Sequence, residues 1–172
     1  MNMSTAVHIS LEEYLNTDYE PDCDYVDGTI EERNVGKKTH SKVQMRLSAW
    51  LYSRAGEHKQ DVLLEQRIQV SPSRVRIPDI CLVDQRAIGE VVQQPPALCV
   101  EILSPDDRWD RIQDRLTDFL SFGVPTIWII NPYTKEAWIA TPDAPVTPVK
   151  DGKLRCAGLK LQAELNEILP RE

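Results

Sequence analysis

Apolar residues recur along this chain with the period of a helix in two segments. Residues 39–54 and residues 106–122 each place apolar side chains at the i, i+4, i+7 and i+8 positions of one helix face, so each is predicted to form an amphipathic helix. The second segment ends before Gly123, a residue typical of a helix C-terminus. A shorter helix is predicted after Ser10, because its hydroxyl can cap the first turn and Glu13 completes a capping box.

Short apolar runs between these helices predict the strands of a sheet. Within residues 25–32, Asp27-Gly28 predicts a tight hairpin turn between two short strands. Residues 77–83 form a strand entered through Pro78, which lacks an N–H and therefore suits a strand start or edge. The remaining predicted strands span residues 62–70, 97–103, 126–130 and 137–140.

The order of these elements predicts the fold class. The strand, helix and strand within residues 97–130 form a crossover unit, which implies parallel pairing and a right-handed connection. The hairpins imply antiparallel pairing elsewhere. We therefore predict an α/β protein with a mixed β-sheet core flanked by helices, built as a single domain over residues 1–172.

The composition narrows the class of protein. Hydrophobic residues make up 41% of the chain and charged residues 27%, which is typical of a globular protein. The net charge of −7 argues against a broad basic coat for nucleic acid, but not against a local basic cleft. No segment approaches the roughly 20 apolar residues that span a bilayer, and no signal-peptide pattern opens the sequence, so a cytoplasmic protein without a membrane partner is expected. The four cysteines form no CxxC pair and are predicted to be structural thiols, with Cys81 and Cys99 buried in apolar runs.

Two acids stand where packing disfavours them. Glu101 interrupts the apolar strand ALCVEIL, and Asp79 precedes the apolar run ICLV. A buried carboxylate costs several kcal/mol unless it is paired or binds a cation. Two acids on adjacent strands can point into one crevice, and a divalent ion relieves their repulsion. The alternative is a structural ion pair with a nearby arginine, for which the candidates are Arg74, Arg76 and Arg108.

Five segments together resemble a known family. In chain order they read DGTIEER, HSKVQMRL, RIPDICLVD, ALCVEILSPDDR and QDRLTDFLSFGVPTIWIINP. This order resembles the Uma-two family of restriction endonucleases, within the PD-(D/E)XK nuclease superfamily, over roughly residues 10–142. The resemblance implies a restriction-endonuclease-like mixed β-sheet core flanked by helices.

The resemblance also implies roles for individual residues. Asp79 matches the motif aspartate and Glu101 the acid of the (D/E)XK half-motif; both would ligate Mg²⁺ or Mn²⁺, with the backbone carbonyl of Ile102. Glu32 matches an acid supplied from the N-terminal part, and the alternative is a solvated acid at a hairpin end. His40 would lie near the site, and the alternative is a polar residue of a helix's first turn.

The lysine of the standard motif is missing. It belongs two positions after Glu101, where this chain has Leu103; in the family it is usually supplied by the next helix, and the matching position is Arg115. Arginine can clamp a phosphate, but it is a poor base because it keeps its proton. Gln113 could orient a water molecule or contact nucleic acid from the same helix. The alternative for Arg115 is a solvated helix residue in a surface ion pair.

A small basic loop precedes the helix at His40. Its Lys37 and Lys38 could contact a phosphate backbone, although a charged loop tip is the alternative. The aromatic residues of the apolar periodic runs are predicted to be core rather than base-stacking platforms; these are Trp50, Phe119, Trp128 and Trp138.

Three functions remain open from the sequence. The resemblance implies metal-assisted hydrolysis of phosphodiester bonds in DNA by an endonuclease that acts as a homodimer. The first alternative is a catalytically weak or inactive nuclease-fold module that binds metal or nucleic acid, which the Arg115 substitution favours. The second is a structural protein that dimerises through a sheet edge.

Overall fold

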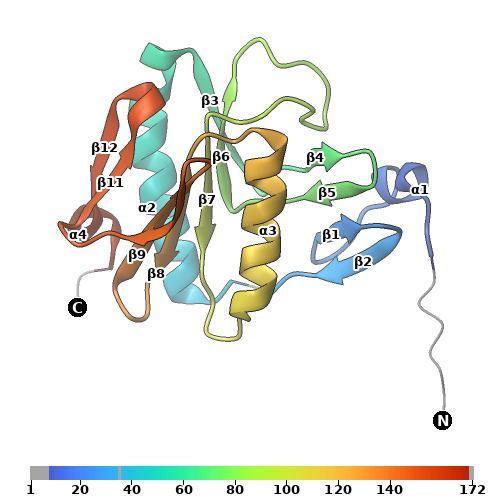
Figure 1. Cartoon of the computed structure of the whole chain (residues 1–172), viewed down its shortest axis with the longest axis horizontal. Helices are drawn as coiled ribbons and strands as arrows, with labels where there is room; N and C mark the ends of the chain where they lie inside the picture. Colours follow the sequence, from blue (N-terminus) through green and yellow to red (C-terminus); the bar gives the residue numbers. More distant parts are fainter. Residues whose placement is uncertain (1–7, 35, 171–172) are drawn as a thin grey trace.

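A six-stranded mixed sheet forms the centre of the protein (Figure 1). The computed structural model describes residues 8–34 and 36–170. The strand order is β10-β9-β8-β7-β6-β3, with bounds β3 (Gln60–Leu64), β6 (Ile80–Asp84), β7 (Leu98–Ile102), β8 (Ile127–Asn131), β9 (Glu136–Thr141) and β10 (Ala144–Pro148). Strands β7 and β8 are parallel and the other neighbours antiparallel, which confirms the predicted crossover and mixed sheet.

Two helices cover opposite faces of this sheet (Figure 1). Helix α2 (Lys38–Ala55) buries Val43, Leu47 and Leu51 against one face, and helix α3 (Trp109–Phe122) buries its apolar side chains against the other. Gly123 ends α3 in the left-handed conformation, with φ of 109°, as its place after the apolar period predicts.

A second, four-stranded sheet lies beside α3 (Figure 1). Its order is β2-β1-β5-β4, with bounds β1 (Cys23–Val26), β2 (Thr29–Glu32), β4 (Ile68–Ser71) and β5 (Arg74–Arg76). Asp27 and Gly28 both take positive φ between β1 and β2, at 49° and 89°, so the predicted hairpin is confirmed. Helix α1 (Leu11–Leu15) precedes it, capped by the Ser10 hydroxyl as predicted.

Two predicted strands are wrong in their bounds. Residues 62–70 are not one strand but two, since β3 and β4 belong to different sheets and Glu65 breaks the chain between them with φ of 48°. Residues 77–83 contribute only from Ile80 onward, and β5 precedes them. Pro78 therefore lies in the connection between two sheets, which suits its missing N–H.

The C-terminal part closes the core on the α2 side. It comprises β11 (Lys153–Cys156), β12 (Leu161–Glu164) and α4 (Leu165–Ile168), whose apolar residues join the cluster under α2. Short 3₁₀ turns occupy Gly56–His58 and Ala157–Leu159. All four cysteines are free and buried, which confirms the burial predicted for Cys81 and Cys99. Across residues 8–34 and 36–170, no helix combines the length and apolar character that crossing a membrane requires.

Candidate active site

The register of β6 and β7 brings the two predicted acids together. In this antiparallel pair Ile80 lies opposite Val100, and the Asp79 N–H donates to the Val100 carbonyl at 3.1 Å. Side chains alternate along a strand, so Glu101 lies on the α3 face of the sheet with its neighbours Cys99 and Leu103. Asp79 and Glu101 are buried, at 5% and 4% exposure.

Three donors hold the Asp79 carboxylate. Its Oδ2 accepts the Ile102 backbone N–H at 2.6 Å and lies 3.3 Å from His40 Nε2, while its Oδ1 accepts Arg33 Nη2 at 3.0 Å. Burial raises the pKa of Asp79, but the His40 hydrogen bond and the Arg33 charge outweigh it, and the pKa is lowered. Asp79 is therefore an oriented, ionised acid.

His40 lies beside Asp79 in the first turn of α2, which agrees with a place in the site. Burial lowers the pKa of His40, but the hydrogen bond and charge of Asp79 outweigh it and raise the pKa. Its Nδ1 is buried and has no partner among the described residues. Gly36 leaves room for this ring, since a Cβ there would lie 2.7 Å from Nδ1.

Glu101 meets the guanidinium of Arg115. Arg115 Nη2 donates to both carboxylate oxygens of Glu101, at 2.7 and 2.9 Å. Burial raises the pKa of Glu101 to about 7, and the Arg115 charge opposes that rise. Arg115 is itself buried at 8% exposure, so it is not the solvated helix residue of the alternative interpretation.

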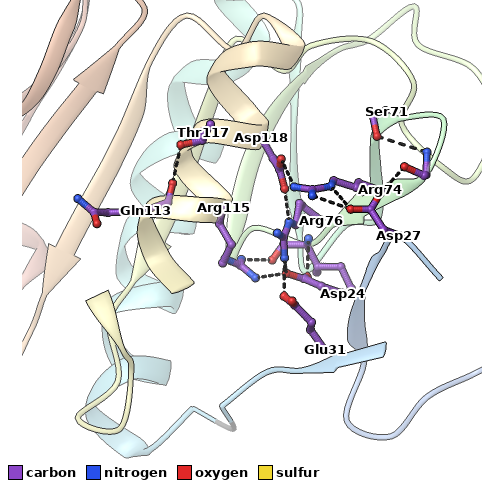
Figure 2. Close-up of polar contacts among 12 residues, drawn as sticks. Asp24, Asp27, Glu31, Ser71, Arg74, Arg76, Gln113, Arg115, Thr117 and Asp118 are labelled. Carbon is purple, nitrogen blue, oxygen red and sulfur yellow. Dashed lines mark hydrogen bonds and ion pairs between the residues drawn. The ribbon is translucent and has the colours of Figure 1, made fainter. Parts of the chain in front are cut away.

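A network of buried charges fixes Arg115 (Figure 2). Its Nη1 donates to Asp24 Oδ2 at 2.5 Å and its Nη2 to the Ile77 carbonyl at 2.7 Å. Asp24 Oδ2 also accepts Arg76 Nη1 at 3.1 Å, and Arg76 Nε reaches Asp118 at 2.7 Å. The network joins β1, β5 and α3, so residues of the small sheet position Arg115 of α3 against Glu101 of the large sheet.

Asp24 and Arg33 are the residues that the sequence does not indicate. Asp24 lies in a short strand of the hairpin, where an acid is usually solvated, yet only 2% of it is exposed. Its one sequence signal is its place in the strand CDYV, between residues that are also buried. Arg33 follows that hairpin and gives no signal by spacing. Within residues 8–34 and 36–170, the arginines that the sequence offers as partners, Arg74, Arg76 and Arg108, form no ion pair with Asp79 or Glu101. Arg33 pairs with Asp79 and Arg115 with Glu101 instead.

A polar cavity of about 110 Å³ opens over these groups. Asp79, Glu101, Ile102, His40 and Arg115 all line it, and Glu32 lines it from the exposed end of β2. Positive charge comes from Arg33, Arg108, Arg111 and Arg115, and further acids from Asp24, Glu31, Asp106 and Asp107. The cavity thus offers both signs of charge to a ligand.

Three predicted residues lie away from the cavity. Lys37 pairs at the surface with Asp106 at 3.0 Å, and Lys38 is exposed at the start of α2. Gln113 projects from α3 on the side opposite Arg115 (Figure 2) and lines a different groove. Within the described part of the chain, no three His, Cys, Asp or Glu side chains gather as a metal-ligand group.

The mixed sheet between two helices, with two buried acids that line one cavity beside the β6–β7 pair, defines a restriction-endonuclease-like α/β protein. The model of the Uma2 family, described as "Putative restriction endonuclease", matches residues 11–164, and the chain belongs to this family. The resemblance seen in the sequence is thereby confirmed.

Among solved structures the chain is similar to a "putative nuclease belonging to DUF820" from Anabaena variabilis ATCC 29413. The TM-score is 0.83 at 20% identity, over 93% of this chain and 97% of that chain. At this identity the likeness supports the fold. No curated protein matches the chain.

Proposed function

We propose that this protein is a divalent-metal-dependent endonuclease that hydrolyses phosphodiester bonds in DNA. The observation that carries the proposal is the meeting of two buried acids, Asp79 and Glu101, at one cavity beside the Arg115 guanidinium. A purely structural ion pair gains nothing from an opening to solvent, whereas a phosphate substrate requires one. Membership of a restriction-endonuclease family supports the reaction class.

The donor set fits a divalent ion held jointly with substrate. Mg²⁺ is commonly bound by one or two carboxylates together with substrate phosphates, and Mn²⁺ accepts the same oxygen ligands. Asp79, Glu101 and the backbone carbonyl of Ile102 would supply these oxygens. When bound, the ion would polarise the phosphoryl group and lower the pKa of a water molecule.

The surrounding side chains would orient the acid Asp79 and neutralise the charge of the phosphate. Arg33 and His40 hold Asp79 in one ionised orientation. Arg115 cannot release its proton at ordinary pH, so its role would be electrostatic, against the charge that develops on the phosphate. Glu32 would act from the cavity rim, and the basic loop of Lys37 and Lys38 would contact the phosphate backbone.

Plasmid cleavage tests this proposal. Supercoiled DNA is incubated with Mg²⁺ or Mn²⁺ and with wild type, Asp79→Asn or Glu101→Gln. Each substitution is expected to lower the cleavage rate roughly 100-fold or more, because it removes a charged ligand without changing the side-chain shape. The matched control is Glu57→Gln, an exposed acid in the 3₁₀ turn that follows α2, which should leave the rate unchanged.

All rates are compared below the melting temperature of each variant, with circular dichroism confirming the folded state. Undiminished cleavage by both site variants, or cleavage that survives EDTA, would contradict the proposal. A wild type that shows no cleavage but is stabilised by Mn²⁺ points instead to the second candidate.

The second candidate is a nuclease-fold module with weak or no turnover. The observation that favours it is the engagement of both Glu101 oxygens by Arg115, which Asp24 holds in turn. A metal would compete with a guanidinium for Glu101. Because Arg115 keeps its proton, that competition does not ease with rising pH in the ordinary range.

Arg115→Lys separates the two candidates. Lysine has a single nitrogen and cannot reproduce the separate contacts of Nη1 and Nη2. We expect cleavage to be maintained or raised, because a desolvated lysine can give up its proton and free Glu101. A folded Arg115→Lys protein with much slower cleavage than wild type would show instead that the guanidinium itself is required.

A further inference from the structure

An aromatic groove adjoins the cavity of the candidate site. Trp109 at the start of α3 is 43% exposed, and Tyr133 in the turn after β8 is 39% exposed. Trp109 contacts Trp138 of β9, with ring centroids 6.0 Å apart and planes inclined by 53°. Trp138 is half-buried, so the prediction that it belongs to the core holds only in part. Exposed aromatic side chains gathered at one place indicate a binding surface.

The groove has the size of a ligand site and is continuous with the cavity. It encloses about 470 Å³ between the loop after β7, the start of α3 and the turn after β8, within the roughly 300–1,000 Å³ typical of small-molecule pockets. Ser104, Asp107 and Ile112 line both the groove and the cavity. One extended ligand can therefore occupy both spaces.

We propose that this groove binds a nucleobase of the same strand whose phosphate lies in the cavity. The inference rests on the proposed function and adds a base-binding subsite to it. Aromatic faces suit every base, because stacking does not depend on the hydrogen-bonding edge. Asn131 adds a polar edge to the groove, and its Oδ1 accepts the N–H groups of Tyr133 and Thr134, at 3.0 and 3.2 Å.

Charge at the junction favours a nucleic-acid strand over an apolar peptide. Arg108 and Arg111 line the cavity at the start of α3. Arg108 forms an ion pair with Asp110, with Nη2 and Oδ2 2.7 Å apart. Arg111 forms no ion pair with any residue in the described ranges. The acid at the junction, Asp107, already accepts the Ser104 N–H at 2.6 Å and the Asn34 amide at 2.5 Å. An uncommitted cation beside aromatic faces matches a phosphate that carries a base.

Gln113 lies near the same aromatic residues but lines a second groove. It lines a neighbouring groove of about 500 Å³, which also contains Trp109 and Trp138. The contact with nucleic acid that the sequence predicts for Gln113 is therefore proposed at this surface rather than in the cavity.

Binding of short single-stranded DNA tests the inference without turnover. Fluorescence anisotropy in EDTA compares a labelled oligonucleotide with the same strand carrying abasic sites. Wild type should bind the complete strand more tightly. Trp109→Ala should weaken that binding roughly 5- to 150-fold and leave the abasic strand unaffected, as expected for loss of stacking on one base. Trp109→Phe should retain most of the preference.

Tyr52→Ala is the matched control, since Tyr52 is an aromatic residue of α2 with 78% exposure and does not line the groove. Equal weakening of both strands by Trp109→Ala, no effect of it, or no base preference in wild type would overturn the inference. So would sedimentation showing a dimer that Trp109→Ala dissociates, because the groove would then hold a second copy. Metal-dependent plasmid cleavage lost in Asp79→Asn, without any base preference, would leave the proposed function standing alone.

Discussion

Replacing Arg115 by methionine is expected to lower the free energy of unfolding by about 3–5 kcal/mol. Methionine keeps most of the side-chain length but removes the charge that Asp24 and Glu101 share. Both acids are almost fully buried, so neither can be rehydrated without opening the core. Glu101 can take up a proton, because burial already raises its pKa to about 7. We therefore expect Asp24 to bear most of the cost.

Thermal denaturation followed by circular dichroism measures this effect. A loss of that size corresponds to a Tm lower by roughly 6–20 °C in a chain of this length. The control is Arg111→Met on the same helix, an exposed arginine without an ion pair in the described part of the chain, which should stay within about 0.5 kcal/mol of wild type. If the two variants melt together, Arg115 does not stabilise the fold through this network.

The sequence predicts the large sheet well because the responsible signals are local. Buried strands such as residues 97–103 appear as continuous apolar runs, and the helices as periodic ones. The break at Glu65 could not be predicted, because a non-glycine residue with positive φ carries no local mark. Whether β4 pairs with β3 or joins a second sheet depends on contacts with β5 that lie outside its own segment.

In the candidate site, too, the residues with a local sequence signal could be predicted and those placed by long-range contacts could not. Glu101 could be found because an acid in an apolar strand conflicts with burial, and Asp79 because it precedes another such strand. Arg33 could not be found, since it reaches Asp79 from the end of a hairpin 46 positions away. The resemblance indicates Arg115 as a site residue, but its contact with Glu101 depends on how α3 packs on the sheet. Asp24 shows the limit most clearly. Its burial arises only when the small sheet packs beside α3 (Figure 1).

The ion pair between Glu101 and Arg115 also changes the stability expected for Glu101→Gln. From the sequence alone, an isolated acid in an apolar strand predicts that Glu101→Gln leaves the fold at least as stable. In the structure the acid neutralises Arg115. We therefore expect Glu101→Gln to cost about 1.5–3 kcal/mol, as for a hydrogen bond to a charged group, since Arg115 retains Asp24.

Asp24→Asn is expected to destabilise the protein more than Glu101→Gln does, by about 3–5 kcal/mol. Asp24 Oδ2 accepts hydrogen bonds from both Arg76 and Arg115, and Oδ1 accepts the Ile77 N–H at 3.1 Å. Asparagine keeps the shape but turns one acceptor into a donor that faces two cations. Arginine cannot shed its proton, so the two buried guanidinium groups cannot relieve the repulsion as a buried carboxylate can.

Urea unfolding of Asp24→Asn, Glu101→Gln and the control Asp27→Asn measures this order. Asp27 lies in the same hairpin and pairs with Arg74, but about half of its side chain is exposed, so its substitution should leave the urea midpoint close to that of wild type. An equal loss of stability in Asp24→Asn and Asp27→Asn would mean that Asp24 contributes no more than an exposed ion pair does. The predicted order instead makes the β1–β2 hairpin a structural support of the site, because the group that fixes Arg115 against Glu101 comes from the smaller sheet.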